Sequence, residues 1–153
     1  MKIGDMLRRE YIIEDLQSKS KPDVLGELSG IFQRGGVPVD REHVVRVLMD
    51  REKLGSTGIG DGIAIPHGKL PGLEELIVSF GRSKEGVEFD AMDGKRVHIF
   101  FLLMAPENAT SQYLKTLAKI SRMLKDGNFR KQLLTAKTKD EILAAVSEKD
   151  DGC

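Results

Sequence analysis

Residues 51–70 read Arg-Glu-Lys-Leu-Gly-Ser-Thr-Gly-Ile-Gly-Asp-Gly-Ile-Ala-Ile-Pro-His-Gly-Lys-Leu, and this stretch is more constrained than any other part of the chain. A charged helix end leads into a loop with four glycines in eight residues, which allows backbone angles that other residues resist. A short apolar run follows, and it leads to a histidine between Pro66 and Gly68. Proline fixes φ before His67, and glycine allows the chain to turn after it. We therefore expect the backbone to hold the His67 imidazole at a strand end, as the working residue of the protein.

The size and composition of the chain are those of a single globular domain. Its 153 residues suffice for one domain with a sizeable core, which we expect to span residues 1–153. Hydrophobic residues make up 40% and charged residues 31%, both ordinary for a soluble protein. Lysine plus arginine and aspartate plus glutamate both number 24, so the formal net charge is zero. This balance argues against a nucleic-acid partner, which normally requires a basic surface.

The cysteine content and the apolar runs predict a soluble cytoplasmic protein. The only cysteine is Cys153, which excludes an intramolecular disulfide and is expected to be a solvent-exposed tail residue. The longest apolar run, residues 97–105, is interrupted by His98 and is too short to span a bilayer. The first residues contain no apolar signal segment. We therefore expect no membrane insertion.

Apolar spacing and capping residues predict alternating helices and strands, and hence an α/β domain with two or three layers. Residues 97–104 are apolar on both faces, which predicts a central buried strand. Helices are predicted after the caps Ser20, Asp40 and Thr138 and over residues 114–124 and 129–136, and strands over residues 12–13, 63–65, 76–80, 86–89 and 97–104.

The glycine-rich loop first suggests phosphate binding. Gly55 and Gly60 have the spacing of the two glycines of a nucleotide-binding P-loop, but Asp61 and Gly62 stand where lysine and serine or threonine belong. A carboxylate at that position would repel phosphates. The dinucleotide-binding fingerprint does not fit either, because no long helix follows the glycines. A tight connection between a helix and a strand is the simpler interpretation, and the glycines would also let the backbone of a partner approach.

The other histidines give His67 no obvious partner. His43 lies on a helix flank beside charged residues, and His98 opens the apolar strand. No pair of histidines has the spacing of a zinc helix or finger, so we expect no metal site. A serine hydrolase is also disfavoured, because the chain has no Gly-x-Ser-x-Gly sequence.

A lone histidine suits covalent chemistry. A neutral imidazole is a good nucleophile near neutral pH and can carry a phosphoryl group. A nearby cation should stabilise the negative charge of that group during transfer. Arg51 and Lys53 both precede the loop, and Arg51 is the better candidate because a guanidinium binds phosphoryl oxygens in a planar fork. From composition alone, a solvated arginine at a helix end is the safer interpretation of Arg51.

The same stretch strongly resembles the active-site segment of enzyme IIA domains of the bacterial phosphoenolpyruvate-dependent phosphotransferase system, fructose/mannitol class. Leu-Gly-Ser-Thr-Gly-Ile-Gly at residues 54–60 and Ala-Ile-Pro-His-Gly-Lys at residues 64–69 are most similar to the nitrogen-regulatory branch. The similarity continues through residues 89–94 and 101–106 and covers nearly the whole chain. It implies an α/β domain with a mixed sheet of about five strands and helices on both faces.

The resemblance also assigns site residues. His67 matches the phosphorylated histidine, Arg51 matches the arginine beside it, and Thr57 is expected to neighbour the phosphoryl site. The family usually places a second histidine at the start of the helix that follows residue 106, where this chain has Tyr113. We expect the Tyr113 hydroxyl near the His67 imidazole. Because tyrosine does not titrate near neutral pH, this difference puts onward transfer as in the sugar branch in doubt.

The family implies a phosphotransferase that forms a covalent phosphohistidine without a cofactor. The donor would be the phosphohistidine of a small HPr-like carrier, and the recipient a regulated protein or a IIB domain. A cytoplasmic regulatory phosphocarrier is the leading interpretation. One alternative is the IIA component of a fructose- or mannitol-type sugar transporter whose other domains are separate chains. An alternative of another class is a binding module that kept the fold but accepts no phosphate.

Overall fold

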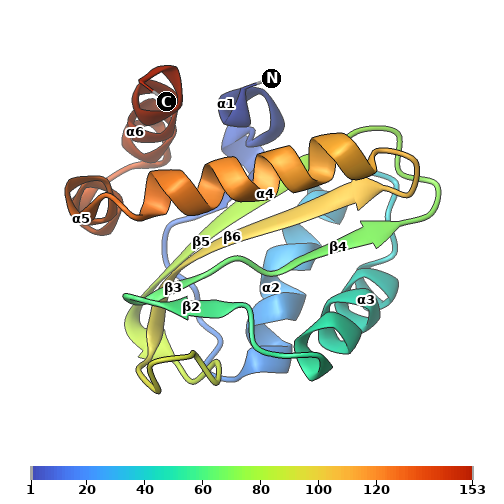
Figure 1. Cartoon of the computed structure of the whole chain (residues 1–153), viewed down its shortest axis with the longest axis horizontal. Coiled ribbons are helices and arrows are strands. Elements are labelled where there is room, and N and C mark those ends of the chain that lie inside the picture. Colours follow the sequence, from blue (N-terminus) through green and yellow to red (C-terminus); the bar gives the residue numbers. More distant parts are fainter. Residues whose placement is uncertain (1, 153) are drawn as a thin grey trace.

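A six-stranded mixed sheet runs through the computed structural model of the chain, which describes residues 2–152 (Figure 1). The expectation for Cys153 therefore lies outside the described residues. The mixed α/β class is confirmed, and the sheet has one strand more than the five expected. The strand order is β1 (Ile12–Ile13), β5 (Ile77–Val87), β6 (Val97–Pro106), β3 (Ile63–Ala64) and β2 (Gly58–Gly60), with β4 (His67–Leu70) also paired to β6. Pairs β5–β6 and β2–β3 are antiparallel, and the other pairs are parallel.

Helices cover both faces of the sheet, as expected (Figure 1). On one face, α2 (Lys21–Arg34) packs against β5 and α3 (Arg41–Lys53) packs against β4. On the other face, α4 (Thr110–Leu124) lies across β6. The remaining helical elements are α1 (Ile3–Met6), the 3-10 turn η1 (Arg9–Tyr11), α5 (Gly127–Thr135) and α6 (Lys139–Asp151). Among residues 2–152, none of these helices is long and apolar enough to cross a membrane.

The three capping residues expected from the sequence begin α2, α3 and α6. Ser20 accepts a hydrogen bond from the Asp23 amide, and Asp40 and Thr138 accept equivalent bonds at their own helices. Such a cap typically stabilises a helix by about 1 kcal/mol. Helix α4 has no side-chain cap and begins at Thr110, several residues before the first apolar position of its stripe. Its start was therefore predicted too late.

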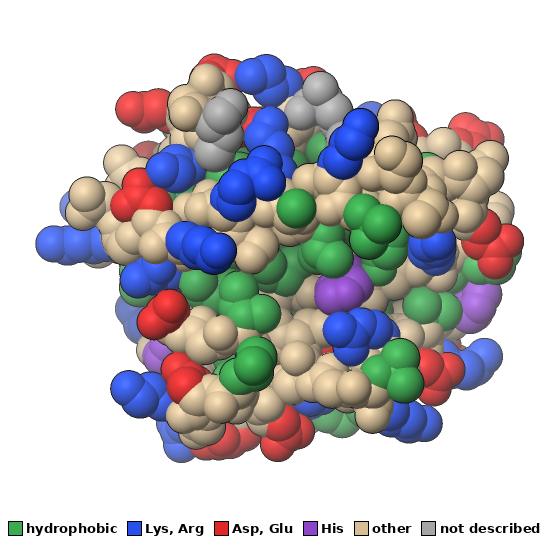
Figure 2. Space-filling model, viewed as in Figure 1, with side chains coloured by type: hydrophobic (Ala, Val, Ile, Leu, Met, Phe, Trp, Pro, Cys, Tyr) green, Lys and Arg blue, Asp and Glu red, His purple; other side chains and the backbone are tan. Residues whose placement is uncertain are grey.

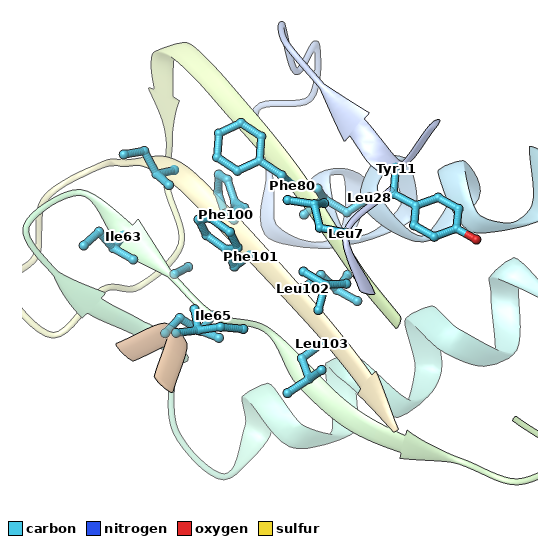
Figure 3. Close-up of a cluster of buried hydrophobic side chains, with 14 of the residues drawn as sticks. Leu7, Tyr11, Leu28, Ile63, Ile65, Phe80, Phe100, Phe101, Leu102 and Leu103 are labelled. Atoms are coloured by element: carbon cyan, nitrogen blue, oxygen red, sulfur yellow. The ribbon is translucent and has the colours of Figure 1, made fainter. Parts of the chain in front are cut away.

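The central strand β6 is buried on both faces, as its continuous apolar sequence predicted. The ring centroids of Phe80 and Phe101 lie 5.2 Å apart, and those of Phe89 and Phe100 lie 5.3 Å apart, both in edge-to-face contacts. Figure 3 shows aromatic and aliphatic side chains of β5, β6 and the neighbouring elements interlocked in this core. The sheet that carries the histidine therefore has a rigid centre.

The sequence analysis did not predict two of the strands, β2 and β4, and it predicted a third, β5, to be too short. Strand β2 consists of Gly-Ile-Gly and β4 of His-Gly-Lys-Leu, so neither shows the alternation that marks a strand. Strand β5 runs on to Val87, although an end at residue 80 and a separate remnant at 86–89 were expected. The polar and glycine residues in its second half hide the continuation.

Strands β3 and β4 run along the same side of β6 with one register, and Pro66 lies in the gap between them. Proline has no amide hydrogen to donate to a neighbouring strand, and it is therefore tolerated where the pairing with β6 is interrupted. Its carbonyl accepts a hydrogen bond from the Leu103 amide at 2.9 Å, which keeps the chain beside β6. His67 is consequently the first residue of β4, paired with Leu103.

Gly68 has a different role from the turn expected of it. It lies within β4, opposite Met104, and does not reverse the chain. A Cβ atom at this position would stand 2.8 Å from Cγ1 of Val47 on α3. The glycine is therefore needed because α3 approaches the strand closely just behind the histidine.

We predict that Gly68→Ala destabilises the protein by about 1–3 kcal/mol through overpacking against Val47. The same substitution in a Val47→Ala background should cost less, because the clashing methyl groups are then absent. Urea unfolding of the four proteins, with the slope of the transition checked for constancy, measures the coupling. An equal cost in both backgrounds would show that close packing on α3 is not the reason for the glycine.

Candidate functional site

The His67 imidazole is held by the backbone of its own segment. Its Nδ1 lies 2.6 Å from the carbonyl oxygen of Ile65. A carbonyl oxygen can only accept a hydrogen bond, so Nδ1 carries the proton that it donates. The other ring nitrogen, Nε2, then has the free lone pair in the neutral ring. The geometry thus leaves Nε2 as the ring nitrogen whose lone pair could act as a nucleophile.

The surroundings of His67 lower its pKa from the usual value. Partial burial of the ring is the main cause, and the positive charge of Arg51 acts in the same direction. The hydrogen bond to Ile65 and the negative charge of Glu52 oppose the shift. The imidazole is therefore held in its neutral, nucleophilic form at neutral pH.

Arg51 lies in the last turn of α3, and the structure brings it close enough to influence both His67 and Tyr113 electrostatically. Its Nη1 donates a hydrogen bond of 2.9 Å to the carbonyl of Gly55, which anchors the guanidinium at the start of the glycine loop. Lys53, the other cation considered from the sequence, is exposed and pairs with Asp50 at 3.4 Å. Arg51 is thus the cation of the α3 end that belongs to the site.

Helix α4 places Tyr113 against the histidine. The two ring centroids are 6.0 Å apart, with the ring planes tilted by 56°. Burial raises the pKa of the Tyr113 hydroxyl, and Arg51 only partly offsets this. The tyrosine therefore stays neutral across the physiological range, and its ring shields the imidazole from water.

Lys69 is a site residue that the sequence analysis missed. It follows His67 by two positions in β4, so both side chains lie on the same face of the strand. Its Nζ donates a hydrogen bond of 2.7 Å to Oγ1 of Thr110 and lies 5.8 Å from the Tyr113 ring centroid. The alternation of a strand would have indicated this residue, had β4 been recognised.

Thr57 lies beneath the surface of the site. It is buried, and its hydroxyl donates a hydrogen bond to Oε2 of Glu52, while its amide donates one to Oε1 of the same carboxylate at 3.1 Å. Its side chain is therefore committed to Glu52. The sequence analysis also missed Glu52, although it follows Val44 and Leu48 at helical spacing on the buried stripe of α3.

The glycine loop forms a tight connection from α3 into the β2–β3 hairpin. Gly60, Asp61 and Gly62 have φ of 99°, 56° and 77°, a left-handed run that glycine makes possible. A Cβ atom on Gly58 would lie 2.9 Å from the Cα of Ala91, so that position requires close backbone contact. Within the described part of the chain, no group of three or more histidine, cysteine, aspartate or glutamate side chains could hold a metal ion.

Exposed hydrophobic residues come from the segments that border His67. Figure 2 shows a histidine near the middle of this face, with a basic side chain beside it and hydrophobic side chains above and below. Met92 is joined to the glycine loop by a 3.0 Å hydrogen bond from its amide to the Gly58 carbonyl. We call these residues the apolar rim, with exposed fractions in parentheses: Leu54 (85%), Ile59 (42%), Met92 (81%) and Leu114 (57%).

Comparison with known proteins agrees with this arrangement. Residues 5–149 match the family model described as phosphoenolpyruvate-dependent sugar phosphotransferase system, EIIA 2. A nitrogen regulatory protein of Bradyrhizobium diazoefficiens is 39% identical over 148 residues, which cover 96% of this chain and 95% of that protein. The fructose-specific EIIABC component of Bacillus subtilis is 36% identical over 150 residues, 98% of this chain but only 24% of that protein.

A solved structure shares the whole architecture. The crystal structure of the nitrogen regulatory protein IIA-Ntr from Neisseria meningitidis superposes with a TM-score of 0.88 at 37% identity. The match covers 94% of this chain and 98% of that chain. The chain therefore belongs to the EIIA type 2 family of the phosphoenolpyruvate-dependent sugar phosphotransferase system.

Proposed function

We propose that this protein is a cytoplasmic histidine phosphocarrier whose His67 accepts a phosphoryl group from the phosphohistidine of a small HPr-like carrier. The observation that carries the proposal is the hydrogen bond from Nδ1 of His67 to the Ile65 carbonyl at 2.6 Å. It orients a neutral imidazole with Nε2 available for attack. Membership of a phosphotransferase family supports the same chemistry.

The transfer is an exchange of one nitrogen–phosphorus bond for another. The Nε2 lone pair of His67 attacks phosphorus, the bond between phosphorus and the donor ring breaks, and its electron pair returns to the donor nitrogen. A donor ring protonated on its second nitrogen leaves as neutral imidazole. The Nδ1 proton of His67 remains hydrogen-bonded to Ile65, so atoms and charges balance.

One cation, Arg51, acts on the ring that receives the dianionic group, and a second, Lys69, lies on the same strand face. Arg51 is tethered to Gly55 at the end of α3, and Lys69 projects from the same face of β4 as His67. Positive charge placed before the reaction stabilises the transferring phosphoryl group without reorganisation. Tyr113 excludes water from one side of the imidazole and adds no charge of its own.

The regulatory branch is the better-supported assignment within the family. The nitrogen regulatory relative aligns along nearly its full length, and Tyr113 at the position of the family's usual second histidine puts onward transfer as in the sugar branch in doubt. The fructose-specific relative favours the second candidate, a IIA component that passes the group to a IIB domain. Incubating the phosphorylated protein with a separate fructose-type IIB domain distinguishes the two, because only the transporter component should lose its phosphoryl group rapidly.

The first prediction from the proposed function concerns the acceptor. Incubation with phosphoenolpyruvate, enzyme I and an HPr-like carrier should add one acid-labile, base-stable phosphoryl group, measured by intact mass. The His67→Ala protein should gain no phosphoryl group. The His43→Ala protein, in which the substituted histidine lies on α3, should behave as the wild type. Phosphorus NMR should identify the Nε2 isomer. A binding module on the same fold would show no mass increase, and labelling of the His67→Ala protein would refute the assignment.

The second prediction concerns Arg51. Arg51→Ala should slow transfer by about 10²–10³-fold, the usual cost of a lost electrostatic contact in a transition state. It should also raise the pKa of His67, because the arginine charge lowers that pKa. As the pH is lowered, the transfer rate of the Arg51→Ala protein should therefore begin to fall at a higher pH than that of the wild type, because its His67 becomes protonated earlier. NMR titration and rapid-quench kinetics test both effects, and an unaltered rate would make Arg51 a surface residue.

The third prediction concerns carrier docking. The apolar rim and the zero net charge lead us to expect binding dominated by burial of hydrophobic surface. Met92→Asp should raise the carrier concentration needed for half-maximal transfer more than a rise in salt does. Leu134→Asp, at an exposed leucine on α5, serves as the matched control. Steep salt dependence, or equal effects of the two substitutions, would contradict an apolar interface.

A further inference from the structure

A buried ionic cluster lies directly below the proposed phosphoryl site. One carboxylate oxygen of Glu52 accepts hydrogen bonds from the Thr57 amide and from Nζ of Lys21, both at 3.1 Å. The other oxygen accepts the hydroxyl of Thr57. Lys21 is itself nearly buried, lies 4.7 Å from the ring centroid of Phe89 and is 3.4 Å from the Asp90 carboxylate. The cluster joins the start of α2, the end of α3 and the glycine loop.

A continuous series of hydrogen bonds leads from this cluster to the histidine. Glu52 holds the amide and hydroxyl of Thr57, and the Thr57 carbonyl accepts the Ile65 amide at 3.1 Å. The Ile65 carbonyl then accepts the Nδ1 proton of His67 at 2.6 Å. The carboxylate therefore fixes the peptide segment that sets the tautomer and orientation of the imidazole.

A second branch of the same cluster reaches the arginine. The backbone carbonyl of Glu52 accepts the Gly55 amide at 3.0 Å, and the Gly55 carbonyl accepts Nη1 of Arg51 at 2.9 Å. The loop that Glu52 closes through Thr57 is thus the loop that anchors the guanidinium. The carboxylate of Glu52 thus acts on His67 through Thr57 and Ile65, and its backbone carbonyl holds the Gly55 peptide that binds Arg51.

Stability alone is a weak reason for such a cluster. A buried carboxylate has a large desolvation cost, and the C-terminal turn of a helix is the unfavourable end for a negative charge. A well-packed apolar replacement for a buried ion pair is often equally stable. What an apolar pair would lack is the set of directed hydrogen bonds that orient Thr57 and, through it, Ile65.

We propose that Glu52, together with Thr57 and Lys21, is a positioning residue that holds His67 in the Nδ1–H tautomer and Arg51 beside it for phosphoryl transfer. The inference rests on the proposed function for its catalytic consequence, although the orientation of the ring is independent of it. The groups that act on or pack against the ring are Arg51 and Glu52 from α3 and Tyr113 from α4, and Lys69 of β4 lies over the Tyr113 ring.

Glu52→Gln removes the charge while keeping the size of the side chain. Glutamine has one acceptor oxygen in place of two, so it cannot accept the hydrogen bonds of both the Thr57 amide and the Thr57 hydroxyl in the same way. It also removes the negative charge that pairs with Lys21. The loop should then hold Ile65 less tightly, so the Nε2–H tautomer of His67 should appear. The pKa of His67 should fall, because the Glu52 charge that raises it is lost. The maximal transfer rate should drop by about tenfold to a hundredfold, with carrier affinity unchanged.

The experiment compares five proteins: wild type, Glu52→Gln, Thr57→Val, Thr57→Ser and Asp50→Asn. Nitrogen NMR of the unphosphorylated proteins reports the tautomer and pKa of His67, and single-turnover transfer from the carrier gives the maximal rate. Thr57→Val, which replaces the hydroxyl by a methyl group, should reproduce part of the Glu52→Gln effect. Thr57→Ser, which keeps the hydroxyl, should behave as the wild type. Asp50→Asn removes an exposed charge two residues before Glu52, on a different side of α3 from the buried carboxylate, and should match the wild type.

The outcomes separate this inference from the proposed function. A wild type that takes up no phosphoryl group refutes the proposed function, while the NMR data still decide whether Glu52 orients the ring. A wild-type tautomer and pKa in both Glu52→Gln and Thr57→Val overturn the positioning role, even if stability has fallen. If Glu52→Gln does not fold, the contrast between Thr57→Val and Thr57→Ser gives the same decision.

Discussion

The parallel pairing of β4 with β6 is the constraint on which the site depends. Strand β6 is buried on both faces, so it cannot shift without disturbing the whole core. It holds His67 opposite Leu103, and the carbonyl of Pro66 secures the chain one residue earlier. The proposed nucleophile is therefore held by the buried central strand of the sheet, whereas Arg51 and Tyr113 come from helices.

The electrostatics of the site combine opposing effects on a single imidazole. Burial and Arg51 favour the neutral ring, whereas Glu52 and the Ile65 carbonyl favour the protonated one. The balance leaves the pKa of His67 low, which suits an acceptor that must offer a lone pair. In the phosphorylated state that we propose, the same arginine would be a favourable neighbour of the phosphoryl dianion. One cation would thus serve both the free and the phosphorylated states.

Local chemistry made much of the fold predictable, and tertiary contacts hid the rest. The caps at Ser20, Asp40 and Thr138 and the apolar run of β6 are properties of short segments, and the structure confirms them. The role of Gly68 depends on Val47 of another element, which no local pattern reveals. Resemblance pointed to His67 and Arg51. The contact of Lys69 with the Tyr113 ring and the burial of Thr57 became visible only in the folded structure.

The two kinds of residue around His67 divide the work of recognition and reaction. The apolar rim stands on backbone that the structure fixes, since the Met92 amide is bound to Gly58 and Gly58 touches Ala91. A preformed apolar surface loses little entropy on docking and excludes water from the buried contact. Removal of water strengthens the attraction between Arg51 and an incoming phosphoryl group. In the proposed function, affinity for the carrier and stabilisation of the transferred charge therefore arise from different side chains, and the first makes the second stronger.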